Sequence, residues 1–210
     1  MSTFIENQNW RYATKKFDPS KKIAAHDLHL LKQAIQLSTS SYGLQLFSVL
    51  DVQDAAIRAK LLPASWGQKQ IVDASHVFVF ASYTHADSGD IDNYIDRVIA
   101  VRGVPAAALK GYSDFMKSSI GKLTDDQKLI WNQKQVYLAM GNLLNAAAEL
   151  KIDVCPMEGF DSKQYDEILD LTAQGLTATL VATIGYRADD DATQNAPKVR
   201  KSLEKLFKTL

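Results

Sequence analysis

Two basic segments at opposite ends of the chain, and a glycine-containing segment between them, hold the residues best suited to bind an anionic, flat ligand. Arg11 and Lys15 belong to the first basic segment, and Lys198 and Arg200 to the second. Cations far apart in sequence can converge on one phosphate, which needs several donors. Between them lies a Pro-Met-Glu-Gly-Phe turn at residues 156–160, where glycine lets backbone N–H groups approach a ligand closely. The pattern predicts a site for a nucleotide cofactor.

Taken one at a time, these residues have simpler interpretations. Isolated Lys and Arg side chains are mostly solvated surface charges. Glu158 beside Gly159 is a common turn pair. The serines at 40 and 41 suit any loop that follows a helix, because Ser bonds nearby backbone. The cofactor interpretation therefore depends on the segments acting together.

Five stretches carry a resemblance to a known family. They are residues 11–18 (RYATKKFD), 38–45 (STSSYGLQ), 72–76 (VDASH), 134–138 (KQVYL) and 156–160 (PMEGF). In this order they make the chain similar to the FMN-dependent nitroreductases, in the branch of oxygen-insensitive NAD(P)H nitroreductases and dihydropteridine reductases, over residues 4–200. The resemblance implies a nitroreductase-like α+β fold, with a central, mostly antiparallel sheet flanked by helices. It also implies an intertwined homodimer with FMN at the subunit interface.

The resemblance assigns a set of residues to the flavin: Arg11, Tyr12, Ala13, Lys15, Ser40, Ser41, Gly43, Gly67, Gln70, Gln135, Pro156, Met157, Glu158, Gly159, Lys198 and Arg200. Arg11, Lys198 and Arg200 would bind the phosphate. Lys15 would reach the pyrimidine edge and offset the negative charge that gathers at N1–O2 on reduction. The backbone at 158 and 159 would face N5 and O4. Lys15 and Glu158 are the expected catalytic residues.

The substrate pocket is expected to involve Ser41, Tyr112 and Phe115, with the two aromatics as a mobile lid, although such residues more often belong to the core. The chain also departs from its relatives, which often carry Asn and Lys where it has Gly67 and Gln70. A shift of the alignment by one residue would place Gln68 or Lys69 there instead. Gln70 donates a hydrogen bond without a charge, so flavin polarisation would depend more heavily on Lys15.

The function that this implies is an NAD(P)H oxidoreductase with ping-pong kinetics, passing hydride through FMN to a nitroaromatic, quinone, pteridine or flavin acceptor. A non-catalytic FMN-binding protein for storage or regulation is the alternative, and a flavin-independent interaction domain is a third possibility. The sequence leaves open the physiological acceptor and the choice between NADH and NADPH.

The elements that must position these residues follow from hydrophobic spacing. Helices are expected at 4–10, 24–37, 54–61, 91–101, 105–118, 124–150, 162–169 and 202–210, and strands at 47–52, 76–83, 152–155 and 176–186. The second half of the long helix is apolar nearly all round, which predicts burial on several sides, either in a dimer interface, as the resemblance implies, or in the core of a monomer. Residues 187–196 are polar and acidic and are expected to form a surface loop. The alternation is too irregular for a doubly wound sheet, and no linker divides the chain, so residues 1–210 are expected to form one α+β domain.

Composition limits the class of protein. Lys+Arg and Asp+Glu are both 24, which argues against a nucleic-acid binder. A single cysteine, Cys155, suits a reducing cytoplasm and is expected to be a buried small hydrophobe. The first ten residues do not resemble a secretory signal, and no run approaches the ~18 apolar residues of a membrane span. The four histidines show no metal-ligand spacing, so no metal site is expected.

Overall fold

The computed structural model describes residues 3–210. Met1 and Ser2, which belong to the first ten residues considered above for a secretory signal, lie outside the described residues. One sheet organises the protein, and its strands are β1 (Phe47–Asp51), β2 (His76–Tyr83), β3 (Asp153–Met157) and β4 (Leu176–Gly185). Their order is β1-β2-β4-β3, and each neighbouring pair is antiparallel. The expected α+β class with an antiparallel sheet is confirmed.

The central strand β2 is buried on both faces, as its unbroken apolar sequence predicts. Val77 and Val79 point into one hydrophobic cluster, while Phe78 and Phe80 point into another. This alternation is the two-residue period of a strand. Both faces of the sheet must therefore be covered by helices.

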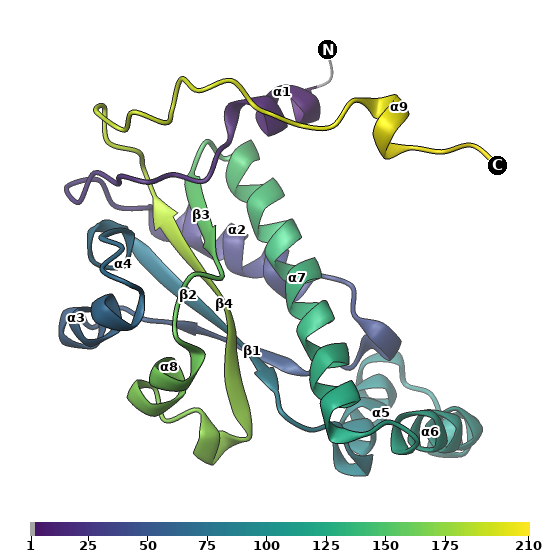
Figure 1. Ribbon diagram of the computed structural model, residues 1–210. Helices are drawn as coiled ribbons and strands as arrows, with labels where there is room; N and C mark the ends of the chain where they lie inside the picture. Colours follow the sequence, from purple (N-terminus) through teal and green to yellow (C-terminus); the bar gives the residue numbers. More distant parts are fainter. Residues whose placement is uncertain (1–2) are drawn as a thin grey trace.

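Two groups of helices cover them (Figure 1). On one face, α2 (Ala25–Gln36) packs against α7 (Asp125–Glu149), and both contribute to the cluster around Phe78. On the other face lie α3 (Ala55–Ala64), α4 (Gln70–Asp73) and α8 (Ser162–Ile168), whose apolar side chains join the cluster around Val77. The sheet is thus the middle layer of three.

A helical pair lies beyond the sheet at one end of α7 (Figure 1). It consists of α5 (Ser88–Arg102) and α6 (Ala106–Gly121), which share a third cluster with the loop around Leu44. Asp87 caps α5 through a capping box, and Thr124 caps α7 in the same way. Short 3₁₀ turns, η1 (Ser41–Gly43) and η2 (Thr172–Gln174), complete the connections.

The two ends of the chain run side by side. The C-terminal segment passes along α1 (Thr3–Trp10) and then leaves the body of the protein (Figure 1). The helix expected at 202–210 is only one turn, α9 (Leu203–Leu206), so that expectation was wrong in extent. Leu203 is 73% exposed and Phe207 is 68% exposed, because the described part of this chain does not cover the apolar face of the segment.

Three further expectations need correction. The strand before the cofactor turn continues through Pro156 to Met157, which an edge strand tolerates because it need not use every N–H. Within the single chain the apolar half of α7 is not buried on several sides, since Tyr137 and Leu138 are each 48% exposed, so a monomeric core does not explain its composition. The acidic segment 187–196 is not uniformly a surface loop, because Asp191 is buried within it. Among the described residues, no helix is long and apolar enough to cross a membrane.

Candidate cofactor site

The first basic segment lies against the edge strand β3. Ala13 forms a parallel bridge with Val154, and Phe17 forms an antiparallel bridge with Arg187. Phe17 is only 2% exposed, so its ring anchors the segment in the core. This arrangement leaves Lys15 and Lys16 exposed while their backbone is fixed.

The buried carboxylate of Asp191 holds that backbone from the other side. Its Oδ2 accepts hydrogen bonds from the N–H groups of Lys15 (2.9 Å) and Lys16 (3.1 Å) and from the hydroxyl of Tyr12 (2.9 Å). Burial alone would raise the pKa of Asp191, but hydrogen bonds from Thr193 and from the two lysine N–H groups hold that pKa far below its usual range. Asp191 was not among the expected site residues, since nothing in the sequence distinguishes it from its acidic neighbours.

The second basic segment folds back onto the first. The Lys198 ammonium donates to the backbone carbonyl of Arg11. Burial, and then the nearby charge of Arg200, lower the pKa of Arg11; burial, and then Arg11 and Arg200, lower the pKa of Lys198. Within residues 3–210, none of these three cations forms an ion pair with a carboxylate. The chain thus gathers positive charge from both ends and leaves it uncompensated.

Lys15 points along β3 toward Cys155, with 3.9 Å between its ammonium and the thiol sulfur. Gln70, only 6% exposed, lies within hydrogen-bonding reach of the same thiol. Burial raises the pKa of Cys155, and the charge of Lys15 partly offsets that rise. Cys155 is 1% exposed, so the expectation of a buried small side chain is confirmed.

The turn after β3 is held from two sides. Tyr137 on α7 donates to Glu158 Oε1 over 2.7 Å, and Gln68 Nε2 donates to the carbonyl of Gly159 over 2.7 Å. The hydrogen bond to Glu158, and then burial, raise the pKa of Tyr137 to about 12. Pro156 and Met157 form the strand end that delivers the turn. The turn is therefore close to Lys15 through β3 and close to α7 through Tyr137.

Trp66 lies against this turn and was missed from the sequence. A Cβ added at Gly159 would meet the Trp66 ring at 3.0 Å, so a larger residue there would push the ring aside. Trp66 has a φ of 55° and its side chain is largely in solvent, 71% exposed. A left-handed conformation costs a bulky residue about 1–2 kcal/mol, and an exposed aromatic held at that cost is typical of a functional surface. The adjacent Gly67, with a φ of 73°, continues the same bend.

The remaining predicted residues form a second group around η1. Gln135 accepts from the Ser41 N–H (2.7 Å) and donates to the Ser41 hydroxyl (3.2 Å), and its burial at 5% makes this contact structural. The Ser40 hydroxyl accepts from the Gln45 N–H. Gly43 needs its glycine, since it has a φ of 78° and a Cβ there would meet Tyr94 at 3.0 Å.

The two aromatic residues that were expected to form a lid, Tyr112 and Phe115, belong to this second group. Tyr42, with a φ of 56°, places its ring edge-on to Tyr112 (6.5 Å between centroids) and Phe115 (6.3 Å). Tyr42 was not among the expected site residues, although it lies inside the matching stretch 38–45. An open cavity of about 570 Å³ adjoins the group, lined in part by Ser40, Gly43 and Tyr112. Among the described residues, no hydrogen bond joins η1 to the basic segments or to the turn at Glu158.

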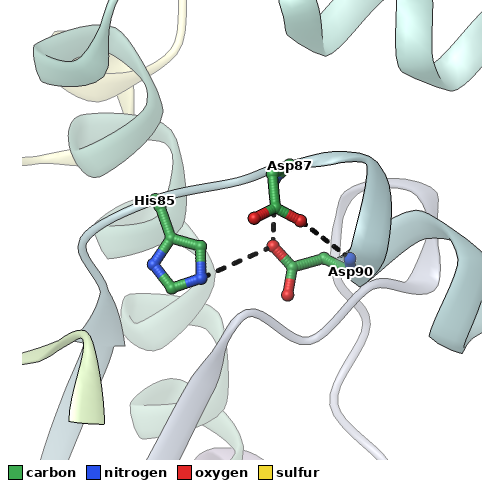
Figure 2. A group of neighbouring side chains, drawn as sticks. All are labelled: His85, Asp87 and Asp90. Carbon is green, nitrogen blue, oxygen red and sulfur yellow. Dashed lines mark hydrogen bonds and ion pairs between the residues drawn. The ribbon is translucent and has the colours of Figure 1, made fainter.

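A histidine and two aspartates meet elsewhere, at the start of α5 (Figure 2). The ligand atoms of His85, Asp87 and Asp90 lie within 4.8 Å of one another, a grouping that the sequence argument did not anticipate. Asp87 accepts from the N–H groups of Gly89 and Asp90, and Asp90 accepts from the N–H of Asp87. Helix capping therefore accounts for both carboxylates without a metal ion.

Comparison with known proteins identifies the class. The sequence profile of the nitroreductase family matches residues 9–186. A Bacillus subtilis (strain 168) protein, provisionally named NAD(P)H nitroreductase YfkO, is 34% identical over 215 residues, covering 97% of this chain and 96% of its own. The oxygen-insensitive NAD(P)H nitroreductase of Salmonella typhimurium is 32% identical over 204 residues, covering 92% and 93%. The chain belongs to the nitroreductase family.

The fold agrees with this assignment. A provisionally named nitroreductase from Exiguobacterium sibiricum, solved in complex with FMN, superposes with a TM-score of 0.84 at 18% identity, covering 100% of this chain and 98% of that one. At the level of the family, the expectations of an NAD(P)H-dependent oxidoreductase and of FMN as its cofactor are confirmed. The site also fits the cofactor, because three uncompensated cations suit a phosphate dianion.

Proposed function

We propose that the protein is an FMN-dependent NAD(P)H oxidoreductase that works by a ping-pong cycle on flat, electron-poor acceptors. The observation that carries the proposal is the convergence of Arg11, Lys198 and Arg200, drawn from opposite ends of the chain and left without a carboxylate partner among the described residues. Holding like charges close together is unfavourable unless a ligand supplies the missing negative charge.

FMN held at its phosphate by Arg11, Lys198 and Arg200 would supply hydride transfer from NAD(P)H to an acceptor, and the two substrates would occupy the same place in turn. The chain's own residues would bind the cofactor, orient its ring and polarise it. Lys15, with its ammonium near Cys155, would stabilise negative charge on the pyrimidine side. Tyr137 keeps Glu158 in one orientation, and Gln68 holds the Gly159 carbonyl, so the turn presents its N–H groups in a fixed arrangement.

The acceptor class follows from the aromatic surfaces. Trp66 exposes its ring beside the turn, and Tyr42, Tyr112 and Phe115 form an edge-on cluster next to η1. Aromatic faces favour flat π-systems through stacking. Nitroaromatics, quinones, pteridines and free flavins all meet this requirement.

The two groups of predicted residues would be brought together by dimerisation. Tyr137 and Leu138 are exposed on α7, and the C-terminal segment exposes Leu203, Leu206 and Phe207. An apolar surface of this kind on a single chain marks an interaction site. In a homodimer, η1 of one subunit would face the basic segments of the other. Light scattering at micromolar concentration is expected to give twice the mass of one chain, and a flavin-loaded monomer would contradict this arrangement.

A visible spectrum tests the function directly. The purified protein is expected to be yellow, and its flavin bands should bleach when NADH or NADPH is added without oxygen. Flavin that stays oxidised with both nucleotides would favour a storage or regulatory protein. A colourless protein that does not bind added FMN would remove the flavin proposal altogether.

A further inference from the structure

The segment 187–196 contains one carboxylate that behaves unlike its neighbours. Asp191 is 3% exposed, whereas the adjacent Asp190 has a side chain 68% exposed and pairs with Lys16. Asp191 receives five hydrogen bonds, two at Oδ1 from the N–H and hydroxyl of Thr193 and three at Oδ2 from residues 12, 15 and 16. Within the described part of the chain it has no Lys or Arg side-chain partner.

We infer that Asp191 is a positioning residue for the cofactor site: it fixes the backbone at Lys15 and Lys16 and thereby places the Lys15 ammonium before a flavin arrives. The inference deepens the proposed function and depends on it for the identity of the cofactor. It assigns to Asp191 no contact with substrate or cofactor.

The geometry supports this role in two ways. A carboxylate oxygen that accepts from two consecutive N–H groups restrains the dihedral angles between them, and charge-assisted bonds of this kind are the stronger class. The same segment is tied again where the Ala188 N–H donates to the Lys16 carbonyl (2.9 Å). The acidic segment therefore clamps residues 15 and 16, and the chain continues from it directly to Lys198.

The clamp explains why an exposed lysine can have a defined place. Lys15 is exposed, and among residues 3–210 the one hydrogen-bond partner of its ammonium is Cys155, over a long 3.9 Å. A flexible lysine would have to be ordered when the ligand binds, which lowers affinity. Fixing the backbone in advance reduces that cost and holds the charge where it can polarise the ring.

The test compares Asp191→Asn with Asp190→Asn, which removes the same charge one residue away. In ¹⁵N-labelled protein, Asp191→Asn should speed amide hydrogen exchange at Lys15 and Lys16 by about tenfold or more, without a similar change in β2. It should raise the FMN dissociation constant by about tenfold and make the reduction potential of the bound flavin more negative. For Asp190→Asn, the amide exchange rates at Lys15 and Lys16 and the FMN dissociation constant should stay within about twofold of the wild type. The reduction potential of the bound flavin should not change.

The outcomes separate the possibilities. Unchanged exchange at residues 15 and 16, or an unchanged potential in flavin-loaded Asp191→Asn protein, would overturn the inference, because a purely structural residue would weaken binding without moving the potential. If the wild type binds no FMN, the proposed function fails, while the exchange experiment still decides whether Asp191 clamps the segment.

If Asp191→Asn does not fold, Thr193→Val is the variant to test, since it keeps the carboxylate of Asp191 and removes one hydrogen bond to its Oδ1. Thr193→Val should change amide exchange at Lys15 and Lys16, FMN affinity and the flavin reduction potential in the same directions but by less. No change in any of them would refute the clamp.

Discussion

Arg187 lies near the group formed by Arg11, Lys198 and Arg200, but Arg187 has a carboxylate partner and that group has none among the described residues. Arg187 is fully matched: it forms a bidentate pair with buried Asp153 (2.6 Å at the shortest) and stacks on the rings of Trp10 (4.4 Å) and Tyr12 (4.5 Å). Arg11, by contrast, lies beside Lys198 and Arg200, and none of the three has a carboxylate partner within residues 3–210.

The contrast shows how structural and ligand-binding charges differ. A buried arginine is tolerated when a carboxylate and aromatic faces replace its hydration. The charge of Arg200 helps to lower the pKa values of Arg11 and Lys198, and such a concentration of like charge is typical of a site whose ligand brings negative charge. Arg187 should therefore matter to folding, and the group around Arg11 to binding.

The largest expected effect is on binding. Replacing Lys198 and Arg200 together by Ala removes two charge-assisted bonds to phosphate, each worth about 1.5–3 kcal/mol. Full additivity would weaken FMN affinity by roughly a hundredfold to ten-thousandfold, measured by quenching of flavin fluorescence. The free energy of unfolding of the flavin-free protein should not fall, because the substitutions remove a repulsion between like charges. Excess FMN should restore most turnover, and a variant that stays slow when loaded would contradict the phosphate role.

Breaking the matched pair should affect stability instead. Asp153→Ala leaves Arg187 without its carboxylate in a largely buried place, which should lower the free energy of unfolding by about 3–5 kcal/mol in urea titrations. Lys198→Ala is the matched control, and it should change stability by about 0.5 kcal/mol or less. Equal losses of stability in the two variants would erase the distinction between the two groups of cations.

A smaller effect, on the rate of flavin reduction, is expected when the charge of Lys15 is removed. Lys15→Met keeps the bulk of the side chain but removes the charge that would offset developing negative charge on the flavin. Flavin should remain bound, while its reduction by NAD(P)H in stopped flow slows by roughly tenfold or more. Reduction at the wild-type rate would remove the catalytic role of Lys15.

The smallest effect should come from Tyr137→Phe, which removes the 2.7 Å hydrogen bond to Glu158 in a half-exposed place. Exposed polar contacts contribute little, so stability should change by about 0.5 kcal/mol or less. The KM for NAD(P)H should rise by about twofold to fivefold if Tyr137 orients Glu158. No change in KM would show that the turn holds its shape without the tyrosine.

The sequence predicted the strands and long helices well because their signals are local. The apolar run of β2 and the Thr124 capping box are read from neighbouring residues. The terminal helix at 202–210 was wrong in extent, since helical spacing alone does not stabilise a short helix that packs on nothing. The strand end at Met157 was also missed, because it depends on β3 being an edge strand.

By itself, the sequence determined the fold class, the family and the chemical types available for a cofactor site, because these depend on residue identity and order. Only the tertiary structure decided which residues act together. It placed Lys198 against Arg11, buried Asp191 among the N–H groups of the basic segment, and set Trp66 against Gly159. Such contacts join residues distant in the chain, so no local pattern encodes them; they follow from how the sheet and its flanking segments pack.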